Sequence, residues 1–383
     1  MKIAMIGHKI IPSREGGVEI VVEELATRLV KMGHSVTVYN RKGKNVADKK
    51  ADKDKRKLKM YKGIRIVRVP TPDNKALNAI VYSFIATIYA LLGNYDVIHY
   101  HAEGPCAMLI IPHFFGIRTI ATIHGLDWQR AKWGGFAKKF LLFGEKCAAK
   151  YADEVIVLSL NVQQYFKDKY NRDTIYIPNG VNKTEFREPD IIKKQFGLEK
   201  DNYILYLGRL VPEKGITYLM EAYSKIDTDK KLVIAGGGSH SSEYVQKIHE
   251  LAAKDDRIVL TGFVQGNLLS ELYSNCYMYV LPSDIEGMPI SLLEAMSFGL
   301  RCLASDIPEN TEACREYARY FKKSDVEDLR AKLEECINRP EVFKKKDAIM
   351  KYCYKRFNWN KVTGSSVRLY IDAILNVERI EQI

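Results

Sequence analysis

The sequence predicts an α/β protein built from two doubly wound, Rossmann-like domains. Three observations lead to this prediction. The chain has 383 residues, the length of two domains of ordinary size. It opens with an apolar strand, a loop, an amphipathic helix and a second strand, and the same order of elements restarts at Asn202. A turn-forming Pro-Asn-Gly sequence at 178–180 separates the two halves. We therefore expect domains at residues 1–180 and 181–364.

The first strand, helix and second strand are predicted from residue patterns. Lys2–Gly7 is an apolar run typical of a buried parallel strand, and Glu19–Met32 has apolar residues at helical spacing. Ser35–Asn40 predicts the next strand. The loop before the helix contains Gly16 and Gly17 but no Gly-x-Gly-x-x-Gly, which argues against a nicotinamide enzyme. A plain turn is the alternative interpretation of this glycine pair.

The first half continues as alternating strands and helices. Further strands are predicted at 64–69, 96–101, 118–124, 154–159 and 174–177. Leu77–Leu92 is apolar and uncharged, so it predicts a core helix, with a membrane-dipping helix as the alternative, because it is too short to span a bilayer. Gln129–Tyr151 predicts a basic amphipathic helix in which lysines accompany phenylalanines.

Polar residues stand at the carboxyl ends of two of these strands. His101 ends the strand 96–101, and His124 ends the strand 118–124 and is followed by Asp127. In a doubly wound sheet, ligands bind beyond these strand ends. The alternative is that such histidines are structural.

In the second half, the loop after the strand Asn202–Leu207 carries two cations. Arg209 and Lys214 bracket a turn between Gly208 and Gly215. An arginine offers a planar fork and a lysine a point charge, and both suit a phosphate. Further on, Phe263 and Val264 follow a strand predicted at 258–260.

The stretch 283–294 is the second motif of this half. It follows the strand 277–281 and opens a helix expected from Pro289 to Phe298. A helix N-terminus carries partial positive charge and unpaired donors, which suit a phosphate. Glu286 and Glu294 flank this end, and their carboxylates suit sugar hydroxyls. A solvated surface loop is the alternative. The residues expected at the helix end are Gly287, Met288, Pro289 and Ile290.

The Glu-x7-Glu spacing, with Leu281-Pro282-Ser283 before it and 294–299 after it, resembles the signature of the retaining family-4 glycosyltransferases. The resemblance implies the GT-B fold, in which two Rossmann-like domains face each other across a cleft. It also implies that Phe357-Asn358-Trp359 crosses back to the first domain, which a helix at 365–383 completes.

The resemblance assigns roles to the candidate residues. Arg209 and Lys214 would hold the donor diphosphate and its leaving charge, Glu294 would bind the ribose, and Glu286 and His124 would lie near the transferred sugar. The remaining assignments are Gly16 and Gly17 facing the diphosphate, Phe263 and Val264 at the base, and His101 and Asp127 on the acceptor side.

The activity implied is that of a retaining hexosyltransferase without cofactor or essential metal. The donor would be a nucleoside diphosphate sugar, with UDP favoured over dTDP or GDP. The acceptor would be a glycan or a polyprenyl-linked glycan in bacterial capsular or other surface polysaccharide synthesis. The Asp-x-Asp triplets at 52–54 and 227–229 lie in Lys-rich stretches and are interpreted as solvated. The alternatives are a GT-B sugar-nucleotide epimerase, or a non-catalytic protein that binds nucleotides or nucleic acid.

Charge and cysteine usage favour a cytoplasmic protein at the inner face of a membrane. Residues 1–180 hold 29 basic and 16 acidic residues, a net of +13, whereas the rest carries −1. Arg41–Lys62 alone holds 11 basic and 3 acidic residues, which solvation would also explain. An anionic membrane is a better partner than nucleic acid, because no nucleic-acid-binding motif is present. Seven cysteines without a Cys-x-x-Cys pair indicate a reducing compartment and no zinc site. We expect no signal peptide and no membrane-spanning segment.

Overall fold

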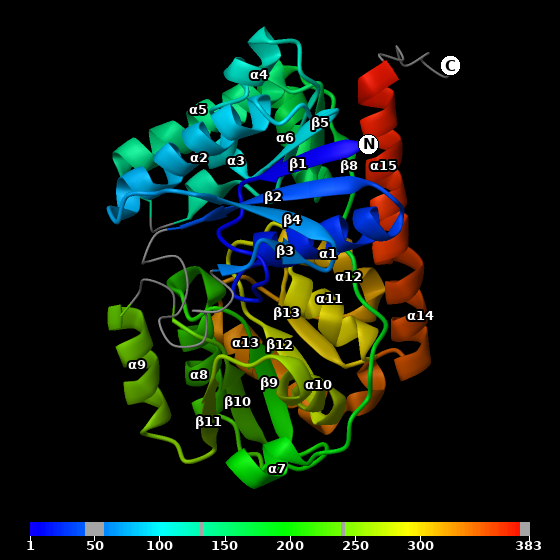
Figure 1. The fold of residues 1–383 in the computed structure, drawn as a ribbon. Coiled ribbons are helices and arrows are strands. Elements are labelled where there is room, and N and C mark those ends of the chain that lie inside the picture. The colour runs from blue at the N-terminus through cyan, green and yellow to red at the C-terminus, as the bar shows by residue number, and fades with distance from the viewer. Residues whose placement is uncertain (43–56, 131–132, 239–241, 376–383) are drawn as a thin grey trace. The chain divides into compact units, whose positions relative to one another are not determined.

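The computed structural model describes residues 1–42, 57–130, 133–238 and 242–375 (Figure 1). The chain forms two compact units, Met1–Asn179 with Trp359–Ile383, and Gly180–Asn358. The boundary between the halves lies within one residue of the predicted one. The chain returns to the first unit at Trp359, within the predicted crossing at 357–359, and the helix expected from 365 already begins there. The Trp359 indole is 2% exposed, and the guanidinium of Arg28 lies 5.7 Å above it, so the helix packs on the first unit from its first residue.

The first unit has an eight-stranded sheet in the order β3-β4-β2-β1-β5-β6-β7-β8. All neighbours are parallel except β3 and β4. Strands β1, β2, β5, β6 and β7 are buried on both faces, as expected of parallel strands covered by helices, whereas β3, β4 and β8 are partly exposed. The two-residue edge strand β3 was not predicted. The strands are β1 (Lys2–Ile6), β2 (Ser35–Arg41), β3 (Met60–Tyr61), β4 (Ile64–Val69), β5 (Val97–His101), β6 (Thr119–Ile123), β7 (Glu154–Val157) and β8 (Ile175–Tyr176).

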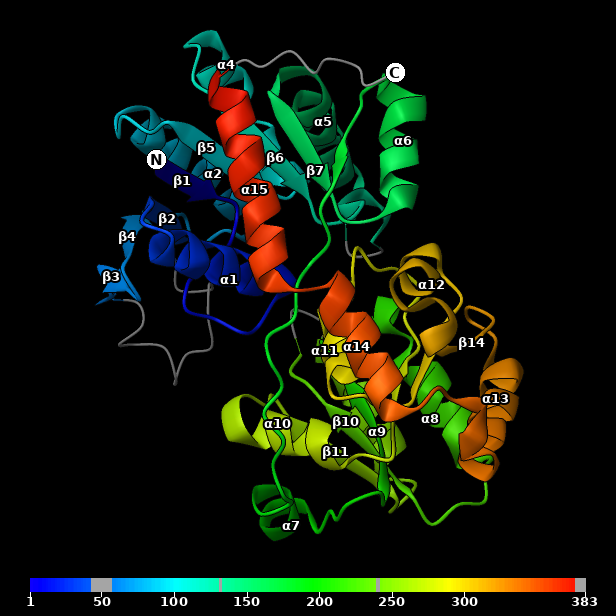
Figure 2. The same cartoon turned by 90° about the vertical axis from the view of Figure 1, so that its right-hand side faces the viewer.

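Helices cover both faces of this sheet. α1 and α15 lie together on one face, and α2, α3 and α5 lie on the other (Figure 2). The expected helix at 129–151 begins only at Gly135, because residues 127–129 form a separate 3-10 turn, η2 (Asp127–Gln129). The helices are α1 (Gly17–Lys31), α2 (Lys75–Leu91), α3 (Glu103–Cys106), α4 (Ile110–Phe114), α5 (Gly135–Tyr151), α6 (Leu160–Tyr170) and α15 (Trp359–Leu375). None of the described helices is both long and apolar enough to cross a membrane.

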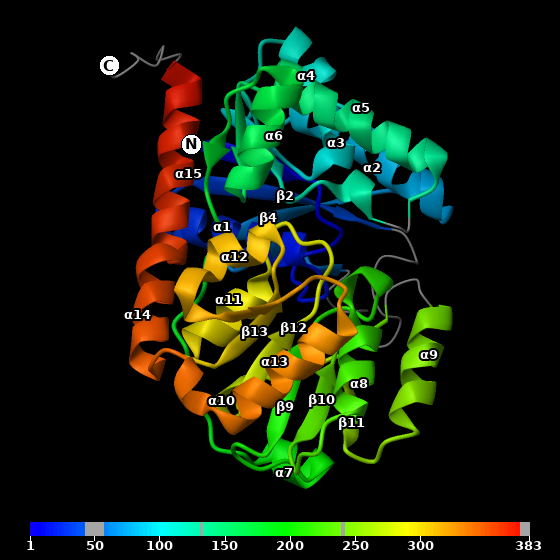
Figure 3. The same cartoon turned by 180° about the vertical axis from the view of Figure 1, so that it is seen from behind.

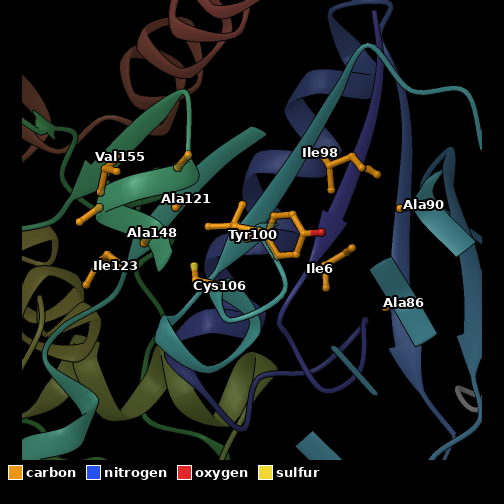
Figure 4. Packing of buried hydrophobic residues seen from close by; sticks show 14 of the residues in the cluster. Ile6, Ala86, Ala90, Ile98, Tyr100, Cys106, Ala121, Ile123, Ala148 and Val155 are labelled. Carbon is orange, nitrogen blue, oxygen red and sulfur yellow. The ribbon is translucent and has the colours of Figure 1, made fainter. Parts of the chain in front are cut away.

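The core of the first unit lies between the sheet and the helices of the α2–α5 face. Ile6, Ile98 and Tyr100 meet Ala86 and Ala90 of α2 there (Figure 4). Further along the sheet, residues of β6 and β7 pack on Ala148 of α5. Small residues on the helices let them approach the sheet closely, so the predicted core role of Leu77–Leu92 is confirmed for one side of α2.

The second unit has a six-stranded parallel sheet in the order β11-β10-β9-β12-β13-β14. This is the doubly wound order, with its reversal between β9 and β12. The three-residue strand β14 was not predicted. The strands are β9 (Tyr203–Leu207), β10 (Lys231–Ala235), β11 (Ile258–Gly262), β12 (Met278–Leu281), β13 (Cys302–Ser305) and β14 (Arg319–Phe321).

Helices again cover both faces of the sheet. α8, α9 and α13 lie on one face, and α10, α11 and α14 lie on the other (Figure 3). Two doubly wound α/β units are therefore present, as the sequence predicts. The helices are α7 (Ile191–Phe196), α8 (Ile216–Ser224), α9 (Ser242–Ala252), α10 (Gly266–Asn275), α11 (Ile290–Ser297), α12 (Pro308–Cys314), α13 (Val326–Asn338) and α14 (Lys346–Arg356).

Candidate active site

In the second unit, two loops meet where the strand order reverses. One follows β9 and the other follows β12, and these strands are neighbours in the sheet. Gly215 has a φ of 63°, and a Cβ there would lie 2.0 Å from the carbonyl oxygen of Pro282. The backbone N–H of Asp284 donates to the carbonyl of Glu213 at 2.9 Å. The loops are therefore fixed to each other through their backbones, at the position where ligands bind in such sheets.

These loops bring Lys214 and Glu286 into an ion pair. The Lys214 Nζ donates to Glu286 Oε1, and the two side chains are only 14% and 9% exposed. Lys214 closes the 3-10 turn η3 (Pro212–Lys214), which the left-handed Gly215 ends. A cation and a carboxylate thus stand side by side at the strand ends, one suited to phosphate and the other to hydroxyl groups.

Arg209 lies on the same loop, five residues before Lys214. Its backbone carbonyl accepts a hydrogen bond from the Tyr206 hydroxyl at 3.2 Å. The half-buried guanidinium is paired with no side chain of the described part of the chain. Its five donors are therefore available to an anion.

The helix after Glu286 starts one residue later than predicted. α11 begins at Ile290, and Pro289 precedes it with an extended ψ of 98°, so this proline is not in the first helical turn. Gly287, Met288 and Pro289 are buried, and no described side chain caps the helix. The partly buried Glu294, one turn inside, accepts a hydrogen bond from the Tyr273 hydroxyl at 3.3 Å.

Phe263 and Val264 follow β11 at the same edge of the sheet. The ring of Phe263 is 48% exposed, whereas Val264 is 7% exposed. Gly262, with a φ of 71°, makes the turn that leads into this pair. An exposed ring at a strand end offers a stacking surface, so the assignment of this loop to the nucleotide base stays a prediction.

In the first unit, His101 and His124 come together at the ends of β5 and β6. Their Nδ1 and Nε2 atoms are 3.1 Å apart, a hydrogen-bonding distance. Burial lowers the pKa of His124 to about 4 and that of His101 well below its usual value, so both rings are neutral at pH 7. His124 is partly exposed, but His101 is fully buried. The acceptor-side role of His101 therefore stays a prediction, and its closest link to the partly exposed part of the site is His124.

His99, for which no role was predicted, continues this histidine row. Its ring stacks on His101 with centroids 4.1 Å apart. Its nitrogens lie 2.8 Å from the Tyr370 hydroxyl of α15 and 2.7 Å from Thr122 Oγ1. The predicted Gly16 and Gly17 lie at the start of α1, which Gly16 precedes and Gly17 opens. A Cβ on Gly16 would lie 2.2 Å from Glu19 Oε2, so the Glu19 side chain already lies at this helix end.

Asp127 opens η2 and forms an ion pair with Arg130 at 2.9 Å. The next residue connects this turn to a buried cluster that sequence analysis missed. Trp128 Nε1 donates to the fully buried Glu145 of α5 at 3.0 Å. Glu145 also accepts from Lys169 at 2.8 Å and from the hydroxyls of Tyr165 at 2.8 Å and Tyr170 at 2.6 Å.

A second buried carboxyl, Glu103, lies beside this cluster. Burial and the charges of Asp127 and Glu145 raise the pKa of Glu103 to about 10, so it is protonated at neutral pH. The one sequence signal for the cluster is an acid on the apolar side of a lysine-rich helix. In the described residues, no group of three or more His, Cys, Asp or Glu side chains is arranged to hold a metal ion.

Each unit therefore gathers its own set of predicted residues. In the second unit, Arg209, Lys214, Glu286 and Glu294 lie on elements at one sheet edge. In the first unit, His101, His124 and Asp127 share the ends of β5 and β6. The triplet at 52–54, most of the basic stretch 41–62 and the end of the expected helix 365–383 lie outside the described residues.

Residues 15–185 match the family model described as Glycosyltransferase Family 4, and residues 188–356 match Glycosyl transferases group 1. An uncharacterized glycosyltransferase of Methanocaldococcus jannaschii is 28% identical over 80% of this chain and 81% of its own. A UDP-Gal:alpha-D-GlcNAc-diphosphoundecaprenol alpha-1,3-galactosyltransferase of Escherichia coli is 27% identical over 59% of this chain and 62% of its own. A putative teichuronic acid biosynthesis glycosyltransferase of Bacillus subtilis is 29% identical over 55% of this chain and 53% of its own.

Solved structures match the fold over nearly the whole chain. Sucrose-phosphate synthase of Thermosynechococcus elongatus gives a TM-score of 0.83 at 22% identity, covering 98% of this chain and 99% of its own. Anabaena HepE in complex with UDP-glucose gives 0.77 at 16% identity, covering 97% and 100%. The two domain matches, the relatives and the fold lead to one assignment: the chain belongs to the family-4 glycosyltransferases and has the GT-B fold.

Proposed function

We propose that this glycosyltransferase moves a hexose, with retention and without a metal, from a nucleoside diphosphate sugar to a glycan or a lipid-linked glycan. The observation that carries the proposal is the Lys214–Glu286 pair at the strand reversal, beside Arg209, whose guanidinium has no side-chain partner among the described residues. UDP is the favoured nucleotide, since HepE was solved with UDP-glucose, and dTDP or GDP are the alternatives.

The proposed chemistry uses this pair directly. Breaking the sugar–phosphate bond places negative charge on the leaving diphosphate, and Arg209, Lys214 and the start of α11 stabilise it. When the donor binds, Lys214 faces the diphosphate and Glu286 accepts hydrogen bonds from sugar hydroxyls. The leaving phosphate accepts the proton of the incoming hydroxyl. We assign no protein nucleophile.

The proposed acceptor follows from the relatives. The Escherichia coli relative is named for transfer to a sugar on diphosphoundecaprenol, and the Bacillus subtilis relative for teichuronic acid synthesis. Surface polysaccharide synthesis on a polyprenyl-linked glycan at the inner face of the membrane is therefore the proposed role.

The test is release of free nucleoside diphosphate from UDP-, dTDP- and GDP-sugars, with and without a sugar diphosphoundecaprenol acceptor. Arg209→Ala and Lys214→Ala should each lower turnover at saturating donor by about 10- to 150-fold, because each removes a charged hydrogen bond worth about 1.5–3 kcal/mol. Lys193→Ala is the matched control, since this exposed lysine, within the described part of the chain, pairs with the exposed Glu199 and no other acid. Near-normal turnover in both site variants would contradict the assignment.

Calorimetry separates the two carboxylates. Glu294→Ala should weaken binding of free UDP. Glu286→Ala should weaken only the UDP-sugar, because it removes a sugar contact while freeing Lys214 for the diphosphate. Equal losses for both ligands in Glu286→Ala would show that Glu286 does not face the sugar. Sugar conversion without acceptor would indicate an epimerase, and nucleotide binding without turnover would indicate a binding protein.

A further inference from the structure

We propose that the outer face of α2, α4 and α5 is a docking surface for an anionic lipid bilayer. Nine of the 16 exposed large hydrophobic residues in the described chain belong to these helices or to the residues that directly follow them. Scattered exposed apolar residues are normal on a protein surface, but a concentration on adjacent elements marks an interaction surface. We call this surface the α2–α4–α5 face, and its charge identifies the partner that it fits.

α2 contributes an apolar stripe. Leu77 and Phe84 are each 49% exposed and Leu92, just past the helix, is 82% exposed. Their spacings of seven and eight residues place them on one side of the helix. The sequence holds no charged residue between Lys75 and Asp96. A surface helix normally turns a charged side to water, as α13 does with Glu327, Arg330 and Glu334. The water-facing side of α2 is instead apolar.

α5 adds alternating rings and charges. Phe136, Lys139, Phe143, Lys146 and Lys150 follow one another at spacings of three and four, which forms a single stripe. All five are exposed, with Phe136 at 73% and Phe143 at 47%. Lys139 and Lys146 form no ion pair with a residue in the described ranges. Phenylalanines and lysines on one side of a helix are typical of helices that lie on a membrane.

α4 joins the two stripes. It contacts both α2 and α5, and α3 packs against both of these helices as well. Phe114 is 84% exposed and Phe115 is 64% exposed, with their rings edge to face at 5.6 Å. The ring of His113 lies at a tilt beside that of Tyr151 at the end of α5, with ring centroids 5.3 Å apart. The exposed apolar residues therefore form one face built from three helices.

Charge decides which partner fits this face. Four acidic residues occur between Lys75 and Tyr151, and none of them forms an ion pair with the exposed lysines of α5 in the described residues. Glu103 and Glu145 are fully buried, Asp127 pairs with Arg130, and Asp96 accepts from the backbone N–H of Lys2. The core of a protein–protein interface is depleted of lysine, whereas the cytoplasmic leaflet of a membrane is negative. Long lysine side chains reach lipid phosphates while neighbouring rings enter the acyl boundary.

The face also adjoins the acceptor-side residues of the first unit. The turn η2, which carries Asp127, packs on α5, and the Lys138 Nζ lies 5.1 Å above the Trp128 ring. Docking would hold this turn near the lipid surface. The inference does not rest on the proposed function, because binding to vesicles needs neither donor nor turnover.

The experiment is co-sedimentation of the full chain with vesicles of phosphatidylcholine alone or with about one third phosphatidylglycerol. We expect binding to the anionic vesicles only, and release by salt at about 1 M, where the Debye length falls to about 3 Å. Replacing Lys139, Lys146 and Lys150 with Gln should weaken binding roughly a hundredfold, since each lysine contributes about 1 kcal/mol. Phe114→Ser with Phe143→Ser should also weaken it. The control replaces Lys193, Lys194 and Lys200, which are exposed in the second unit.

Three outcomes would overturn the proposal. The wild type could stay in the supernatant with anionic vesicles at low salt. The lysine variant could bind as well as the control, which would place the contact elsewhere. Sedimentation velocity could show a dimer that Phe114→Ser with Phe143→Ser dissociates, which would make a second copy the occupant. Unchanged affinity of every variant for UDP verifies that the variants are folded. If the protein binds anionic vesicles but does not turn over a sugar nucleotide, the proposed function fails and the docking surface stands.

Discussion

At the scale of single residues, buried histidines make the first unit sensitive to acid. Burial lowers the pKa of His8 to about 4, that of His99 to about 3 and that of His124 to about 4. All three are neutral in the folded protein at pH 7. In the unfolded chain, each histidine takes up its proton near pH 6.5. The unfolded state therefore binds more protons than the folded state below that pH.

This difference sets the direction of the pH dependence. The stabilisation is fully present above about pH 6.5 and is lost as the pH falls toward the folded pKa values, by about 1.4 kcal/mol per histidine per pH unit. Urea unfolding at about pH 7.5, 6.5 and 5.5 measures it. His99→Gln should flatten the decline, whereas His249→Gln, on an exposed position of α9, should not. A free energy of unfolding that stays constant over this range would disprove the account.

At the scale of elements, α3 and α5 touch through their backbones at one glycine. A Cβ on Gly144 would lie 2.0 Å from the carbonyl oxygen of Glu103 and 3.2 Å from the backbone nitrogen of Ala107. A side chain there forces the helices apart. This contact holds the buried Glu145 next to Glu103, so it also sets the geometry of the cluster behind Asp127.

Two glycine substitutions should change stability in opposite directions. Gly144→Ala should lower the free energy of unfolding by about 1–3 kcal/mol, because it overpacks the α3–α5 contact. Gly364→Ala should raise it by about 0.4–1 kcal/mol, because this helical glycine of α15 has no neighbour within 4 Å of an added Cβ and alanine favours the helix. Thermal or urea unfolding of both variants checks the pair. The same sign for both would contradict the packing argument.

Elements with a strong local pattern were predictable, and those fixed by distant contacts were not. Ile64–Val69 is a strand to the residue, because Gly63 and Pro70 bound it locally. β14 has three residues, too few to show a period. Pro289 was placed inside a helix that starts after it, since proline suits both positions. The Lys214–Glu286 pairing was foreseeable only as two separate motifs.

The buried cluster around Glu145 could not be predicted either, because contacts between elements distant in the sequence form it. The hydrogen-bond partners of Glu145 are Trp128, Tyr165, Lys169 and Tyr170, which come from two other elements. No spacing within any one of these elements reveals that they meet. The role of His99 was missed likewise, because its partner Tyr370 lies 271 residues away in the sequence.

At the scale of the whole molecule, the first unit is built from both ends of the chain, and α15 supplies its last helix. Trp359 and Tyr370 are buried there, and the Tyr370 hydroxyl lies 2.8 Å from His99. A chain that stops at Asn358 should therefore lose the protease resistance of residues 1–179 but keep that of 180–358. Limited proteolysis followed by mass spectrometry reads out both. Tyr370→Phe, which removes one hydroxyl, serves as the mild comparison. A first unit that is equally resistant after truncation would refute its dependence on α15.

The return of the chain through α15 has a consequence for synthesis on the ribosome. Residues 180–358 form a contiguous unit, which can fold as soon as they leave the exit tunnel. Residues 1–179 emerge earlier, but the surface of α1 that α15 covers stays exposed until α15 has been synthesised. During that interval Val21 and Leu25, which are buried in the finished protein, are open to chaperones. The half that is made first is thus the half that matures last.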